Sequence, residues 1–169
     1  MFKRTSTVLV LFLLCQSVAF AGIGSKKAAY MGGTMAAFKE SKKVIEGTLD
    51  TSNNDELRFI YKMNKTEQSA VIPYSSVIDL EYGQKAGRRV GMAVGTTILL
   101  GPLGLLSLLS KKRKHYLTIG FKDSEGKDQV AVFELGKDIV RTTLAIVEKR
   151  SGKLLEYQDD SARKANKGN

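Results

Sequence analysis

Residues 77–121 read VIDLEYGQKAGRRVGMAVGTTILLGPLGLLSLLSKKRKHYLTIGF, and this stretch decides the fold. Its two ends alternate apolar and polar residues, the period-two pattern of β-strands with one buried face. Between them, residues 90–109 form an apolar run of twenty residues without a charge, bordered on both sides by Lys and Arg. If residues 77–82 and 116–121 belong to one sheet, the run must leave that sheet and return to it on the same side.

The middle of the apolar run is the tetrapeptide Gly-Pro-Leu-Gly at residues 101–104. Pro102 removes an amide donor and fixes one φ, and its glycine neighbours loosen the backbone, so the tetrapeptide favours a turn. Each arm of the resulting hairpin would have about ten residues, or about 15 Å of helix, which enters one leaflet of a bilayer without crossing it. In the first arm, Gly91 and Gly95 have the spacing that lets two helices approach closely.

Three interpretations of residues 90–109 stay open: a hairpin embedded in a membrane, a hairpin packed on the domain of a soluble protein, or one helix that spans the bilayer. As a single helix the run would be about 30 Å long, which matches a hydrocarbon core. A spanning helix, however, would put residues 77–82 and 116–121 on opposite sides of the membrane. We therefore favour the membrane-embedded hairpin.

The positive charge of the chain is concentrated beside this run. The sequence has 27 basic and 17 acidic residues, and seven of the basic residues flank the apolar run. Clustered Lys and Arg beside an apolar segment gain about 1 kcal/mol each near an anionic surface. This localised charge argues against a general nucleic-acid binder and indicates an anionic membrane surface as partner, with a homo-oligomer formed through the insert as the alternative.

The candidate site residues all belong to this insert. Those expected to contact lipid are Lys85, Arg88, Arg89, Lys111, Lys112, Arg113, Lys114, Ile98, Leu99, Leu100, Leu103, Leu105 and Leu106. Those expected to form the turn and the helix packing are Gly91, Gly95, Gly101, Pro102 and Gly104. The alternative for the basic residues is an ordinary solvated flank that keeps an apolar segment soluble. The sequence indicates no particular small-molecule ligand.

The first 21 residues have the parts of a secretory signal peptide. After a basic start, residues 8–15 are apolar but too short to span a bilayer, and Ala-Phe-Ala at 19–21 is a small-x-small cleavage site. A lipoprotein would use Cys15, but Leu14 stands where a small residue is needed. We therefore expect export to the cell envelope or periplasm, peripheral membrane association, and a mature chain without cysteine.

The remaining pattern predicts a mainly β (α+β) domain. Short amphipathic runs bounded by turn formers begin at Val44, include residues 57–63, and resume after the insert. Residues 139–147 switch to three- and four-residue spacing and Gly152 follows, which predicts one amphipathic helix on the sheet. We expect about six antiparallel strands in a small barrel or sandwich.

The chain is divided accordingly into a signal peptide (1–21), an N-terminal arm (22–43), a β domain (44–157) with an apolar insert (86–114), and a tail (158–169). The glycine pair at residues 32–33 disfavours a continuous helix in the arm, so a short strand near residues 28–34 is expected there. The tail is polar and mixed in charge, which predicts disorder.

Two motifs beside the insert carry a family resemblance. They are Ile-Pro-Tyr-Ser-Ser-Val-Ile-Asp-Leu-Glu-Tyr at residues 72–82 and Lys-His-Tyr-Leu-Thr-Ile-Gly-Phe at 114–121, which leads to Val-Phe-Glu-Leu at 132–135. They resemble bacterial pleckstrin-homology-like (PH-like) or GRAM-like small β-barrel domains, and the chain is similar to an uncharacterised family of exported bacterial proteins with a Gly-rich apolar insert. The resemblance implies a PH-like barrel closed by a C-terminal helix; its motifs specify packing and imply no ligand.

The sequence offers few residues for catalysis. It has one histidine, His115, and its single cysteine falls in the signal peptide, so nucleophile–base triads and the usual zinc ligand sets lack their components. The acidic residues do not have the spacing of paired catalytic carboxylates or of a calcium loop. We interpret His115 as a surface residue at a strand end, and we expect a non-enzymatic protein without a cofactor.

Overall fold

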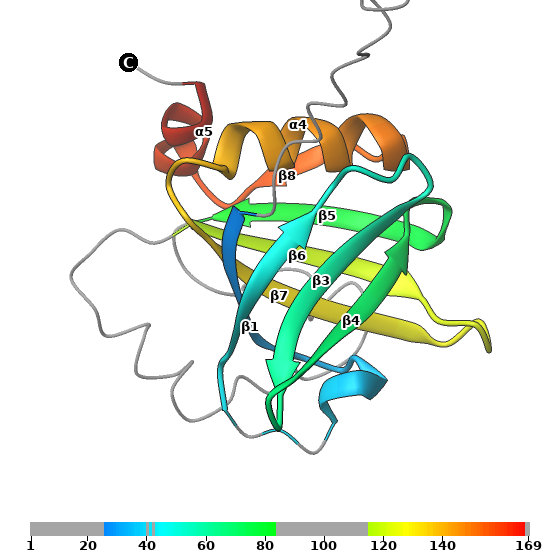
Figure 1. Cartoon of the computed structure of the whole chain (residues 1–169). Helices are drawn as coiled ribbons and strands as arrows, with labels where there is room; N and C mark the ends of the chain where they lie inside the picture. Colours follow the sequence, from blue (N-terminus) through cyan, green and yellow to red (C-terminus); the bar gives the residue numbers. More distant parts are fainter. Residues whose placement is uncertain (1–25, 40, 42, 84–114, 168–169) are drawn as a thin grey trace, which may run out of the picture.

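The computed structural model describes residues 26–39, 41, 43–83 and 115–167. This part of the chain is mainly β: eight strands form one sheet in the order β4-β3-β2-β1-β7-β6-β5-β8. Figure 1 labels most of these strands and the helices α4 and α5. The strand count exceeds the expected six because the N-terminal segment and the residues after the main helix each add a strand. The eight strands form a single open order.

Two antiparallel runs of strands make up most of the sheet. The first run consists of β1 (Lys26–Gly33), β2 (Ile45–Asp50), β3 (Glu56–Met63) and β4 (Thr66–Pro73). The second run consists of β5 (Val77–Gly83), β6 (His115–Lys122) and β7 (Asp128–Leu135). Antiparallel pairing of β1 with β7 joins the two runs, and β8 (Leu155–Tyr157) lies parallel to β5.

The described helices are α4 (Val140–Ser151), α5 (Asp160–Lys167), and the short 3₁₀-helices η2 (Ala36–Phe38) and η3 (Tyr74–Ser76). Helix α4 ends at Gly152, whose φ of 67° is the left-handed conformation that glycine adopts without strain. This confirms the helix that the three- and four-residue spacing predicts, together with its stop.

The core lies on the inward face of the sheet, beneath α4. The large alternating residues of β3 point inward as predicted, since Leu57 and Phe59 are each 1% exposed. Phe59 contacts Phe133 of β7 with ring centroids 5.2 Å apart. From the helix, Leu144 and Val147 close the same cluster. Burial of these side chains is the main source of stability for a fold whose described part is not cross-linked.

The N-terminal segment is a central part of the sheet, not an arm outside the domain. Strand β1 lies between β2 and β7. Its place was hidden in the sequence because Ala28 and Ala29 carry little hydrophobic signal and because the register with β7 shifts between Tyr30 and Gly32. Gly33 is required here: its φ is 133°, and a Cβ would lie 2.1 Å from the Val130 carbonyl oxygen.

A bulge between Val77 and Asp79 makes Val77 the buried residue at the start of β5, whereas Ile78 is only partly buried. The tail was expected to be disordered, whereas residues 160–167 form α5. A small apolar residue and a cap explain this helix: Ala162 is 0% exposed, and its amide donates to Asp159 Oδ1 at 2.8 Å.

Candidate functional site

The residues predicted to contact lipid and to form the insert turn, at positions 85–114, lie outside the described residues. The structure describes the points where the insert begins and ends. Gly83, the last residue of β5, pairs with Tyr116 of β6, and Tyr82 pairs with Leu117. Directly paired Cα atoms lie about 4.5–5.5 Å apart. Both ends of the insert therefore start from neighbouring positions in one sheet, as the sequence predicts.

Tyr82 and His115 form a contact where the insert joins β5 and β6, a junction that we call the root of the insert. The Tyr82 hydroxyl is hydrogen-bonded to His115 Nδ1, and the two rings stack with centroids 6.0 Å apart and an interplanar angle of 9°. Tyr157 of β8 packs against Tyr82 at 6.1 Å in an edge-to-face arrangement. The strands that precede and follow the insert are thus joined by a side-chain contact as well as by backbone pairing.

The protonation states of this pair follow from its partial burial. Burial raises the pKa of Tyr82 to about 12, so its hydroxyl stays protonated and donates to Nδ1. Burial also lowers the pKa of His115, with Lys137 acting in the same direction and Glu134 in the opposite one. The histidine is therefore neutral near pH 7, with its proton on Nε2. It is the first residue of β6, at a strand end as the sequence predicts, and it is partly buried.

His115→Asn is expected to flatten the dependence of stability on pH. The folded pKa of His115 lies below the unfolded value of about 6.5, so the unfolded state takes up a proton first. The contribution of His115 to the free energy of unfolding is therefore complete above about pH 6.5 and is lost as the pH falls through the folded pKa. Asparagine keeps an acceptor for the Tyr82 hydroxyl but does not titrate. Urea unfolding of both proteins between pH 8 and 5 measures this difference; equal slopes would contradict the assignment.

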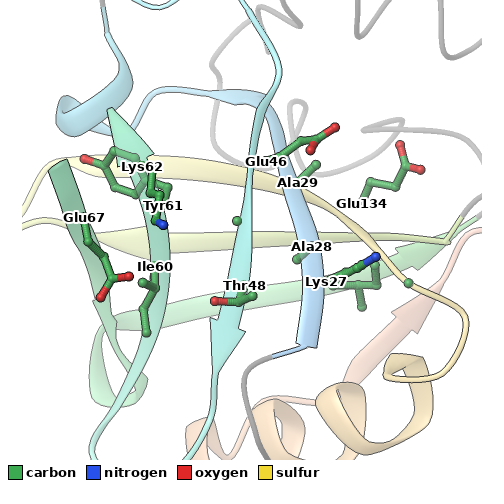
Figure 2. Close-up of a pocket in the computed structure, with 13 residues that line it drawn as sticks. Lys27, Ala28, Ala29, Glu46, Thr48, Ile60, Tyr61, Lys62, Glu67 and Glu134 are labelled. Atoms are coloured by element: carbon green, nitrogen blue, oxygen red, sulfur yellow. The ribbon is translucent and has the colours of Figure 1, made fainter. Parts of the chain in front are cut away.

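A groove of about 790 Å³ crosses the outward face of the sheet (Figure 2). Five strands line it, namely β7, β1, β2, β3 and β4. Ala29 of β1 pairs with Glu46 on one side and with Glu134 on the other, so two carboxylates flank a methyl group. The lining residues are Lys27, Ala28, Ala29, Glu46, Gly47, Thr48, Ile60, Tyr61, Lys62, Glu67, Glu134, Leu135 and Gly136.

The chemistry of the groove is that of a polar surface with charges of both signs. The lining includes Glu46, Glu67 and Glu134 together with Lys27 and Lys62, and it includes no histidine or cysteine. Such a groove can form ion pairs with a ligand, but its described lining provides no nucleophile–base pair. Sequence reasoning missed it because its residues come from five separate strands and are ordinary outward positions in each.

A second apolar cluster lies on the outward face, next to the root of the insert. Tyr116, Val130 and Val132 are at most 2% exposed, and Met31 of β1 joins them. Tyr116 is the residue that pairs with Gly83. The sequence feature that could have predicted this cluster is the continuous apolar run at residues 130–133, which is typical of a strand buried on both faces rather than on one.

Within the described ranges, His, Cys, Asp and Glu side chains do not gather in threes that could hold a metal ion. None of the described helices combines the length and the hydropathy needed to cross a membrane. No family model matches the chain, and the search of curated proteins found no significant match.

Proposed function

We propose that this chain is a non-enzymatic, exported envelope protein whose PH-like β domain holds the insert, residues 86–114, against a membrane. The observation that carries the proposal is the pairing of Gly83 with Tyr116, which brings both ends of the insert together. Both basic flanks then start on the same side of the domain. A hairpin with this root can place seven positive charges around one apolar segment.

The arrangement of strands supports the PH-like part of the proposal. The runs β1–β4 and β5–β7 are both antiparallel, β1 pairs with β7, and α4 follows the last of these strands. This is the order that the family resemblance implies, namely consecutive antiparallel strands followed by a helix. The parallel strand β8 and helix α5 are additions at the edge beside β5.

Two forces would act together in membrane binding. The apolar arms would bury their leucines in one leaflet, a contribution that does not depend on salt. The Lys and Arg flanks would add about 1 kcal/mol each by attraction to anionic lipid, and this part weakens as salt is added. Binding should therefore fall partly, and not completely, on raising the ionic strength.

The outward apolar cluster favours a second candidate. Met31, Tyr116, Val130 and Val132 lie beside the root of the insert, so a leucine-rich hairpin could pack on them within a soluble interaction module. In that case deleting residues 90–109 would uncover the cluster and destabilise the domain. Under the membrane proposal the same deletion leaves the free energy of unfolding nearly unchanged.

Deleting residues 90–109 is expected to reduce binding to anionic vesicles by at least about tenfold, since the apolar arms are then missing. Flotation of the full chain and of the deletion variant with phosphatidylglycerol vesicles measures the effect. A matched variant keeps the arms but changes Lys111, Lys112, Arg113 and Lys114 to Gln; it should bind more weakly and lose most of its salt dependence. A deletion variant that floats as well as the full chain would rule out the proposal.

A further inference from the structure

Among the described strands, β4 forms one edge of the sheet and has β3 as its only neighbour in the strand order. The turn between β3 and β4 has two residues, Asn64 and Lys65, with φ of 51° and 67°, and Met63 pairs with Thr66 across it. In a two-residue hairpin of this type the closing pair exchanges both hydrogen bonds, and the pattern then alternates along the strand.

The alternation identifies which backbone groups point away from β3. Even-numbered residues of β4 bond to β3, and this pattern continues to Tyr74, whose amide donates to the Asp55 carbonyl at 2.9 Å. The N–H and C=O groups of Glu67, Ser69 and Val71 therefore point to the free edge. Pro73 also points outward but has no N–H, so the usable part of the edge ends at Val71.

The side chains of this edge leave it accessible. Residues 66–69 are all exposed. Val71 is 38% exposed and is one of two large hydrophobic side chains that are exposed in the described part of the chain. Glu67 is the only charged residue between Thr66 and Pro73. An accessible edge with one charge and an exposed valine is weakly protected against pairing with another strand.

We propose that β4 is a homodimer interface, at which two copies of this chain pair antiparallel with Ser69 opposite Ser69. In this register Glu67 lies opposite Val71 of the other copy, and about six backbone hydrogen bonds form. The two Glu67 side chains are separated by four residues of strand, about 13 Å, which exceeds the screening length at physiological salt.

Other antiparallel registers of the same edge are less favourable. Moving the symmetry centre to Glu67 places two carboxylates directly opposite each other, which is destabilising. Moving it to Val71 places Pro73 of each copy opposite Ser69 of the other, so two donors are lost. The centre at Ser69 is the register that pairs Glu67, Ser69 and Val71 of one copy with the same three residues of the other, so the proposed partner is a second copy of the chain in this register. The inference concerns the described β domain alone and does not depend on the membrane proposal.

Disulfide trapping tests both the interface and its register. In a full-length chain with Cys15→Ser, Ser69→Cys places two thiols on directly opposed residues about 5.5 Å apart at Cα, within the range of a disulfide. We expect it to form a covalent dimer under mild oxidation. Glu67→Cys, whose counterpart is about 13 Å away, and Ser124→Cys, on an exposed turn far along the chain, should not form a covalent dimer.

Solution mass provides the second readout. The full chain should have the mass of a dimer in light scattering, and Val71→Glu, which leaves the backbone intact and places a carboxylate opposite Glu67 of the other copy, should shift it to the monomer. Ser69→Pro removes an outward N–H and should act in the same way, with circular dichroism as the check on folding. A monomeric full chain, a dimer that persists in Val71→Glu, or equal trapping at all three cysteine positions would each overturn the proposal.

Discussion

Replacing Phe59 with alanine is expected to lower the free energy of unfolding by about 3–5 kcal/mol. Phe59 is 1% exposed and contacts the rings of Phe38, Tyr61 and Phe133, with centroids 5.9, 5.8 and 5.2 Å away. Its removal leaves a cavity where β3, β7 and the η2 segment meet. Urea unfolding followed by circular dichroism measures the loss.

The neighbouring residue of the same strand is the matched control. Ile60 points to the outward face and is only partly buried. Ile60→Ala should therefore cost about 1 kcal/mol, because less apolar area is lost and the site is open to solvent. Equal losses for the two variants would show that the core does not lie on the predicted face of β3.

Replacing Arg150 with methionine is expected to cost about 3 kcal/mol. Its guanidinium connects helix α4 to the turn between β2 and β3: it donates to the backbone carbonyls of Thr51 and Asn53 and to Asn54 Oδ1, the last two at 2.8 Å. It also lies over the Tyr74 ring, 5.6 Å from the centroid. A hydrogen bond from a charged donor contributes about 1.5–3 kcal/mol, and the three bonds here all come from the one guanidinium of Arg150.

Two further variants separate the geometry of this contact from its charge. Arg150→Lys keeps the charge but cannot reach several acceptors at once, so it should recover less than half of the loss. Arg141→Met removes a positive charge from an exposed position on the same helix and should change stability by less than about 0.5 kcal/mol. A loss for Arg141→Met equal to that for Arg150→Met would point to net charge as the cause.

The elements that were predictable from sequence are those with one buried face and clear ends. Strand β3 alternates large inward residues with Arg58 and Lys62, and helix α4 has regular spacing and a glycine stop, so local pattern and burial agree. The pairing of Tyr82 with Leu117 confirms that the strands on both sides of the insert belong to one sheet.

Other features depend on tertiary contacts that leave little local signal. The sequence predicts a short strand near residues 28–34, but the small residues Ala28 and Ala29 and the shift at Tyr30 conceal its central place between β2 and β7. Helix α5 depends on the burial of one alanine, Ala162, against the rest of the domain. The outward groove exists only because the sheet places Glu46 and Glu134 on either side of Ala29. The lipid-contact residues of the insert stay a prediction from charge and hydropathy.

The central claim is that the insert, and not the β domain, enters the membrane. The chain contains no tryptophan, so one introduced tryptophan reports on its position without background. Leu105→Trp places it in the second arm of the insert, and Leu154→Trp places it at an 85% exposed position of the domain as the control.

The measurement is the tryptophan emission maximum with and without anionic vesicles. We expect the emission of Leu105→Trp to move to shorter wavelengths when vesicles are added, while that of Leu154→Trp stays unchanged. Emission from Leu105→Trp that does not respond to vesicles would contradict the claim. If that emission already lies at short wavelength in buffer, the insert packs on the outward apolar cluster instead.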